Sequence, residues 1–170
     1  MIITIEELKK VSELSNIPDE QLTVMCEGIE DFIRQYTNNN FTVKNVTFNT
    51  PSKDGKLETV SPLFNVGDTV LISNSKYNNG VYVLTAMDGT LDKELFDDDN
   101  KVTLVKYPPA VKLGVIKLLQ YNAKMDDKVG ISSESLSRHS VSYAQPTSDS
   151  IGGYPSNLMS FLKPFMKARF

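Results

Sequence analysis

The sequence predicts an α+β fold with a mainly helical core of three main helices, an inserted small antiparallel β-sheet or barrel, and an extended C-terminal arm. Three observations carry this prediction. Apolar residues recur at helical spacing in the first 40 residues and again after Pro108-Pro109. Between these segments the spacing becomes that of strands, separated by Asn-Gly and Asp-Gly turns. After the last long helix the chain is rich in serine and poor in core-sized side chains.

These changes divide the chain into four parts. N-terminal helices occupy residues 1–40, the inserted β subdomain occupies residues 41–107, and a core helix occupies residues 108–125. Residues 126–170 are expected to form an irregular arm that ends in an apolar and basic tail.

Two helices are predicted before residue 40. The first is short and begins at Thr4, because Thr4 and Glu7 have the spacing of a capping box. The second runs from about Asp19 to Tyr36, since a proline followed by two acidic residues opens it. Residues 38–40, all asparagine, end this helix because asparagine tolerates left-handed backbone geometry. Its apolar stripe is the widest in the sequence: Leu22, Met25, Cys26, Ile29, Phe32, Ile33 and Tyr36.

A β subdomain is predicted from residue 41. Its first segment alternates apolar and polar residues from Phe41 to Phe48 with one slip, which predicts a strand with a bulge. Further strands are expected at residues 57–60, 69–73, 81–87 and 102–107. Closely spaced strands joined by such turns imply a small antiparallel sheet or barrel.

The third predicted helix covers residues 110–124. It is apolar around most of its circumference, so it needs burial on more than one side. Gly114 within it costs about 1 kcal/mol relative to alanine. Either a close backbone approach compensates for this cost, or the helix tolerates it.

The tail is both apolar and basic, with no acidic residue after Asp149. Two placements of the tail remain open: packing into the chain's own core, or docking onto another copy or another protein. Pro164 argues against one long helix, because proline removes a backbone donor. If the tail docks, each buried apolar side chain contributes about 1.5–3 kcal/mol.

Composition excludes several classes of protein. The chain has 170 residues, with 18 basic and 21 acidic side chains and a formal net charge of -3. This balance lacks the positive field that nucleic-acid-binding proteins use to hold phosphates. One cysteine cannot form an internal disulfide, and one histidine cannot build a multi-ligand His/Cys metal site. The first residues mix charged with apolar side chains, so we expect no signal peptide, no membrane span, and a cytosolic, unprocessed chain.

No catalytic constellation is found in the sequence. The only histidine, His139, lies among polar residues of the arm, without the context that a catalytic base needs. Cys26 lies in the apolar stripe of the second helix, where a buried thiol is expected. The run Asp97 to Asp99 lacks the ligand spacing of an EF-hand, and the glycines form no phosphate-binding motif. We therefore expect no enzymatic activity, no metal and no cofactor.

Several short segments occur in a definite order along the chain. In the first half they are Ile17-Pro18-Asp19, Asp31-Phe32-Ile33-Arg34-Gln35-Tyr36-Thr37, and Gly67-Asp68-Thr69-Val70 with Asn78-Asn79-Gly80-Val81-Tyr82. In the second half they are Pro108-Pro109-Ala110-Val111-Lys112, Gly130-Ile131-Ser132-Ser133-Glu134-Ser135 with Ser140-Val141-Ser142-Tyr143, and Gly153-Tyr154-Pro155 with Leu158 and Leu162. In this order they resemble the tailed-phage head-tail connector proteins, also called adaptor or head-completion proteins. The resemblance covers most of the chain, and the order of the segments gives it specificity. The ending, residues 165–170, is more apolar than the basic endings typical of the family.

The resemblance implies a structural virion protein of the phage neck, made in the host bacterial cytoplasm. Copies of such a protein form a ring of about twelve under the portal protein and extend the DNA channel. The stopper or tail-completion protein docks on the ring, and no membrane is involved. DNA is a partner only as it passes through the channel, and an acidic wall lets it pass without adhesion.

In such a ring, the acidic run at residues 92–99 and the apolar, basic tail suggest two sets of site residues. The acidic loop expected to face the channel contains Asp92, Glu94, Asp97, Asp98 and Asp99. The residues expected to dock onto the portal protein or a neighbouring copy are Tyr154, Pro155, Leu158, Phe161, Leu162, Lys163, Phe165, Lys167, Arg169 and Phe170.

Two other functions remain as alternatives. Residues 41–107 could form a free-standing binding module that holds a peptide or ligand. A hydrolase or nuclease would need a metal or a base that the sequence does not provide. Within the neck, the helical ends favour an adaptor over the largely β stopper.

Overall fold

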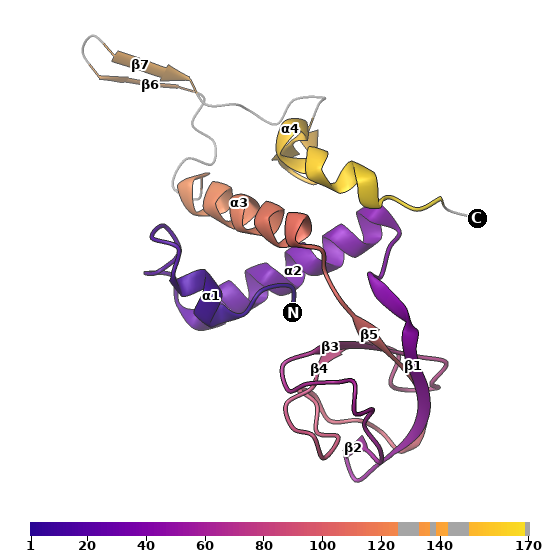
Figure 1. Ribbon diagram of the computed structural model, residues 1–170. Helices are drawn as coiled ribbons and strands as arrows, with labels where there is room; N and C mark the ends of the chain where they lie inside the picture. The colour runs from indigo at the N-terminus through magenta and orange to yellow at the C-terminus, as the bar shows by residue number, and fades with distance from the viewer. Residues whose placement is uncertain (126–132, 137–138, 143–149, 169–170) are drawn as a thin grey trace. The chain divides into compact units, whose positions relative to one another are not determined.

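A computed structural model of the chain describes residues 1–125, 133–136, 139–142 and 150–168 (Figure 1). It contains two compact units. Unit 1 consists of Met1–Ile2 and Asn38–Tyr107, and unit 2 of Ile3–Thr37 and Pro108–Phe170.

Unit 1 contains a five-stranded antiparallel sheet in the order β2-β1-β5-β3-β4. The bounds of its strands are β1 Thr42–Lys53, β2 Lys56–Leu57, β3 Thr69–Ser73, β4 Gly80–Val83 and β5 Asp98–Val105. The register between β1 and β5 shifts between Thr42 and Thr47, which confirms the predicted bulge. The predicted strand at 81–87 is shorter in the structure, and the one at 102–107 begins four residues earlier.

The curled sheet of unit 1 forms the dominant core, so the prediction of a mainly helical core with three main helices was wrong. Eight buried apolar side chains fill this core, and half of them lie outside the strands, in the connections. Those four are Phe64, Leu84, Leu91 and Leu95. Because connecting segments fold their apolar side chains over the sheet, the core is larger than the strand pattern predicts.

Unit 2 contains the helices. Their bounds are α1 Ile5–Lys9, α2 Asp19–Thr37, α3 Pro109–Met125, α4 Ser156–Met159 and the 3₁₀ helix η2 Ser160–Phe165. The capping box of α1 is present, with the N–H of Glu7 donating to the Thr4 hydroxyl at 3.3 Å. α1 is only five residues long, so it is not a main helix. Asn38 adopts a left-handed φ of 50°, which confirms how α2 was predicted to end.

The two long helices of unit 2 pack against each other and against the tail. Their fully buried apolar residues include Leu22 and Ile33 on α2 and Val115 and Leu118 on α3. A Cβ on Gly114 would overlap the ring of Phe161. The close approach, one of the two explanations for a glycine in this helix, is therefore confirmed.

Two short strand pairs follow α3. β6 (Ser133–Leu136) and β7 (His139–Ser142) are antiparallel and lie within the segment predicted as an irregular arm. β8 (Ser150–Ile151) and β9 (Tyr154–Pro155) form a hairpin whose turn, Gly152-Gly153, has positive φ at both residues. None of the helices among the described residues has both the length and the apolar run that a membrane crossing requires.

Candidate functional site

The C-terminal tail is anchored in unit 2 by its own apolar side chains. α4 and η2 follow the β8–β9 hairpin directly, and both pack against α3. Met159 in α4 and Leu162 in η2 are 1% and 0% exposed. Leu162 therefore belongs to the core of its own unit, and its side chain is not available to a partner.

Tyr154 fixes the hairpin to α3. Its hydroxyl accepts a hydrogen bond of 2.8 Å from Nδ2 of Asn122. Its ring centroid lies 6.0 Å from that of Tyr121 and 6.5 Å from that of Phe32. Burial raises the pKa of the Tyr154 hydroxyl, and the hydrogen bond from Asn122 offsets part of this rise. Tyr154 is therefore an uncharged anchoring residue at neutral pH.

Beyond these anchors, the last described residues present apolar and basic groups together. Lys163 and Lys167 are exposed, Met166 is 50% exposed, and Phe165 is half-buried. The backbone N–H of Lys167 donates to the carbonyl of Thr37 at 2.8 Å, which holds the tail against the end of α2. The remaining predicted docking residues are either half-buried, as are Pro155, Leu158 and Phe161, or outside the described residues, as are Arg169 and Phe170.

The five residues of the predicted acidic loop have different surroundings. Three of them accept hydrogen bonds from backbone N–H groups of unit 1: Asp92 from Val83 at 2.9 Å, Asp97 from Asp54 at 3.2 Å, and Asp98 from Tyr77 at 3.2 Å. These carboxylates hold the loops of the β subdomain in place. Glu94 and Asp99 are exposed.

Asp98 organises the loop between β3 and β4. Its Oδ2 also accepts bonds of 2.5 Å from the Ser75 hydroxyl and from the N–H of Lys76. The Ser75 hydroxyl, aided by these backbone donors, holds the pKa of Asp98 below its usual range. The carboxylate is therefore ionised and occupied with loop structure at neutral pH.

Asn78 acts as a strand partner for Phe96. Its Oδ1 accepts the N–H of Phe96 at 2.9 Å, and its Nδ2 donates to the Phe96 carbonyl at 2.8 Å. The same Nδ2 reaches the Ser52 hydroxyl and Oδ1 of Asn100. Asn78 is 1% exposed, so the segment before β5 is held from inside. This leaves the Phe96 ring 69% exposed, with its centroid 6.0 Å from that of Tyr77.

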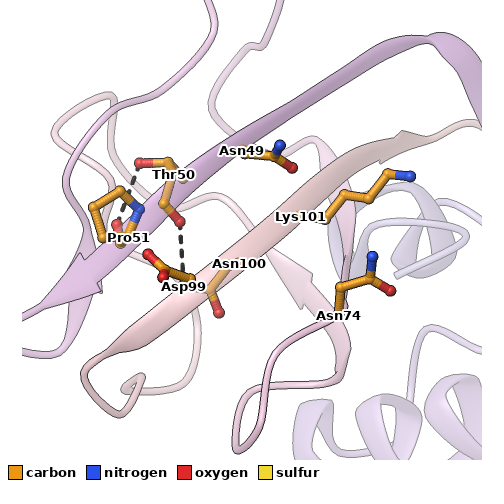
Figure 2. A pocket seen from close by; sticks show the side chains of 7 residues that line it. All are labelled: Asn49, Thr50, Pro51, Asn74, Asp99, Asn100 and Lys101. Carbon is orange, nitrogen blue, oxygen red and sulfur yellow. Dashed lines mark hydrogen bonds between the residues drawn. The ribbon is translucent and has the colours of Figure 1, made fainter.

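A surface pocket of about 440 Å³ lies where β1 and β5 pair (Figure 2). In the β1–β5 ladder, Asn49 lies directly opposite Lys101, and Pro51 lies directly opposite Asp99. These four residues are two apart on each strand, so they share one face of the sheet. Asn74, at the end of β3, completes that face. The full lining is Asn49, Thr50, Pro51, Asn74, Asp99, Asn100 and Lys101. Amide, carboxylate and ammonium groups offer both donors and acceptors, which suits a polar ligand.

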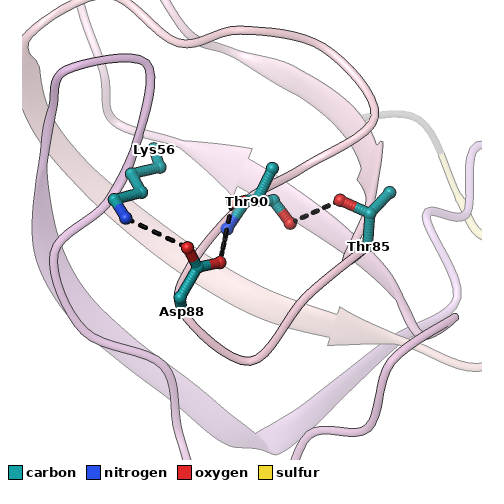
Figure 3. A network of polar contacts seen from close by, with 4 residues as sticks. All are labelled: Lys56, Thr85, Asp88 and Thr90. Atoms are coloured by element: carbon teal, nitrogen blue, oxygen red, sulfur yellow. Dashed lines mark hydrogen bonds and ion pairs between the residues drawn. The ribbon is translucent and has the colours of Figure 1, made fainter.

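A second polar cluster, which shares no residue with the pocket, ties β2 to the turn at Asp88-Gly89 (Figure 3). Asp88 pairs with Nζ of Lys56 at 3.0 Å and accepts the Thr90 hydroxyl at 2.7 Å. The Thr85 hydroxyl donates to the Thr90 carbonyl at 3.0 Å. The Thr90 hydroxyl, followed by Lys56, lowers the pKa of Asp88 to about 2. This cluster is a structural clamp of the β subdomain.

The candidate nucleophile, Cys26, lies in the core of unit 2. Cys26 is 1% exposed, and burial, with a smaller effect of Glu30, raises the pKa of its thiol to about 11. A protonated, buried thiol is a core side chain. His139 lies in β7, and its side chain is outside the described part of the chain. Over the described ranges, no group of three His, Cys, Asp or Glu side chains is arranged to hold a metal ion.

Sequence reasoning missed the pocket and the exposed aromatic pair. The pocket includes the polar residues Asn49, Asn74 and Lys101, which lie in strands or turns. In the sequence they cannot be distinguished from other polar residues that face solvent. Tyr77 and Phe96 have the composition of core aromatics, and the sequence does not show that they are 59% and 69% exposed. In the pocket, Asn49 and Lys101 come together because β1 pairs with β5, two segments far apart in the sequence.

Comparison of the chain with protein-family models finds no match, and comparison with curated proteins finds none.

Proposed function

We propose that this chain is a structural protein of a phage neck, a head-tail connector whose copies form a ring under the portal protein. The observation that supports this most directly is the tail. Its inner residues, Met159 and Leu162, are buried, whereas Lys163, Met166 and Lys167 are exposed. A rigidly held surface that combines apolar and basic groups is suited to docking onto another protein in one orientation.

Charge determines which partner surface fits the tail. The last acidic residue of the chain is Asp149, so the tail carries only basic charge. Its partner surface is therefore expected to surround an apolar contact with carboxylates. In our proposal that surface belongs to the portal protein.

Only some of the carboxylates in the acidic loop are available to line the proposed DNA channel. Asp92, Asp97 and Asp98 hold backbone N–H groups, so Glu94 and Asp99 are the members available to the channel. In the proposed ring these two carboxylates face the DNA. Carboxylates do not displace the counterions bound to the phosphates, so the DNA passes without adhering to the channel wall. The stopper or tail-completion protein binds the other side of the ring.

The portal interaction is tested by measuring the native mass of the chain mixed with the portal protein encoded in the same genome. The wild-type chain is expected to form a stoichiometric complex, and the double variant Lys163→Glu/Lys167→Glu is expected to lose it. A matched control, Lys53→Glu/Lys93→Glu, reverses two exposed lysines of unit 1 and should keep the complex. Absence of a wild-type complex at every salt concentration, or equal binding by both variants, contradicts the proposal.

A second candidate function is a binding module, and the polar pocket favours it. A polar peptide or a small polar ligand would bind across Asn49, Asn74 and Lys101. Titration with short polar peptides, followed by NMR of the side-chain amides, tests this function. Saturable shifts at these amides that vanish in Asn74→Ala would support it, and unchanged spectra would dismiss it for these probes.

A further inference from the structure

Helix α2 carries an exposed acidic stripe. Glu20, Val24, Glu27 and Asp31 recur at i, i+4, i+7 and i+11, so they lie on one face of the helix. All four are exposed, with Val24 at 69% and the Asp31 side chain at 70%. The stripe therefore combines three carboxylates with one large exposed apolar side chain.

Helix α3 carries a stripe with the same spacing and the opposite charge. It contains Leu113, Lys117, Gln120 and Lys124, and Lys112 lies beside it. Leu113 is 55% exposed and the Lys124 side chain is 64% exposed. α3 contains no acidic residue at all. The basic stripe therefore has the same length as the acidic stripe and the opposite charge. Like the acidic stripe, it includes one exposed apolar residue.

The two stripes of one copy cannot pair with each other. α2 and α3 pack together through their buried faces, which include Ile29 and Ile33 on α2 and Val115 and Leu118 on α3. On each helix the stripe lies on the side opposite to the buried face. The two charged surfaces of unit 2 therefore point in different directions.

The acidic stripe is also electrostatically unfavourable without a partner. Glu27 and Asp31 are like charges at i, i+4, an arrangement that destabilises a helix. Among the described residues, an ion pair forms at one end of each stripe: Arg34 lies 3.8 Å from Asp31, and Lys124 lies 3.5 Å from Glu13. Glu13 also accepts a hydrogen bond from Gln120 of the basic stripe. A surface of opposite charge laid along the acidic stripe would relieve this repulsion.

We infer that the acidic stripe on α2 of one copy binds the basic stripe on α3 of the next copy. This inference rests on the proposed function, because it names the contact between neighbouring copies of the ring. A contact between two different surfaces of the same protein is head-to-tail, and such a contact closes into a ring when its rotation permits. The occupant is a second copy, because the same unit supplies both complementary surfaces.

Charge reversal with mixing provides the test. The first variant, Glu27→Lys/Asp31→Lys, is basic on both stripes, and the second, Lys112→Glu/Lys117→Glu, is acidic on both. Each variant alone should remain at the mass of one chain, 19.0 kDa, at concentrations where the wild type associates. Their equimolar mixture should associate again, because each stripe then meets one of opposite charge. Circular dichroism should show an unchanged fold in both variants.

Several results would overturn the inference. The first is that the wild-type chain stays monomeric both alone and with the portal protein. The second is that either charge-reversed variant still associates by itself. The third is that the mixture of the two variants does not associate. Lys53→Glu/Lys93→Glu, in unit 1, is the control and should associate as the wild type does. Portal binding without contact between copies would exclude the stripes and leave the proposed function intact. Association between copies without portal binding would exclude the proposed function and leave the stripes intact.

Discussion

At the residue scale, buried and hydrogen-bonded polar groups position the surface of unit 1. Asn78 and Asn100 are 1% and 3% exposed, and their amides hold Ser52, Phe96 and each other. A buried polar group contributes modestly when it is paired and costs much more when its partner is removed. Single substitutions at these amides therefore test whether the buried hydrogen bonds stabilise the β subdomain.

Asn78→Ala should reduce the free energy of unfolding of unit 1 by about 2–4 kcal/mol, because it leaves the N–H and carbonyl of Phe96 without their partner. Asn45→Ala, at an exposed position of β1, is the matched control and should change it by less than about 0.5 kcal/mol. Urea unfolding followed by tyrosine fluorescence measures both. Equal losses in the two variants would show that the buried network does not stabilise the subdomain.

Acid should weaken the clamp at Asp88. Its pKa lies at about 2 in the folded chain, below the ordinary 3.8, so the folded state favours the charged carboxylate. The resulting stability is present above the ordinary pKa and is lost as the pH falls from 3.8 toward about 2. Asp88→Asn should therefore lower the urea midpoint at neutral pH and have a shrinking effect below pH 3.8. A difference that stays constant with pH would contradict this role.

At the scale of elements, the long helices could be predicted and the tail could not. α2 and α3 have strong apolar periodicity and clear end signals, so their predicted bounds differ from the structure by one residue at most. The tail has the same composition whether it packs on its own core or on a partner. The burial of Met159 and Leu162 depends on the packing of α4 against α3 and of η2 against α2 and α3.

Removal of residues 151–170 should destabilise unit 2, because it deletes two core side chains whose loss costs about 2–5 kcal/mol each. The side chains are Met159 and Leu162, and Phe161 at Gly114 is lost with them. We expect the helical circular dichroism signal to melt at lower temperature, while NMR signals of the sheet in unit 1 persist. An unchanged helical melting curve would show that the tail contributes nothing to the core. For this reason the portal interaction is better tested by substitution than by truncation.

At the scale of the whole molecule, the dominant core was the feature that sequence reasoning placed wrongly. Strand periodicity identified β3 and β1 but gave no weight to apolar residues in the connections. Leu91 and Leu95 lie in an acidic stretch that resembles a solvated loop, yet both are 6% exposed in the core of the sheet. Long-range packing of connections is not encoded in any short periodic pattern, so the size of this core could not be predicted.

The basic and apolar character of the tail was evident from the sequence, and Lys163 and Lys167 are exposed in the structure. Their docking role stays a prediction. The pocket between β1 and β5, and the opposite charges of the exposed faces of α2 and α3, became visible only once burial was known. Val24 lies outside the apolar stripe predicted for its helix, and the structure leaves it 69% exposed among carboxylates.

We propose that copies of this chain assemble under a portal protein. Electron microscopy of the purified portal protein, imaged alone and after saturation with the wild-type chain, would reveal such an assembly. We expect an additional ring of density, coaxial with the portal and attached at one end, which the Lys163→Glu/Lys167→Glu variant fails to form. Portal particles that look the same with and without the saturating wild-type chain would show that the chain does not assemble on the portal.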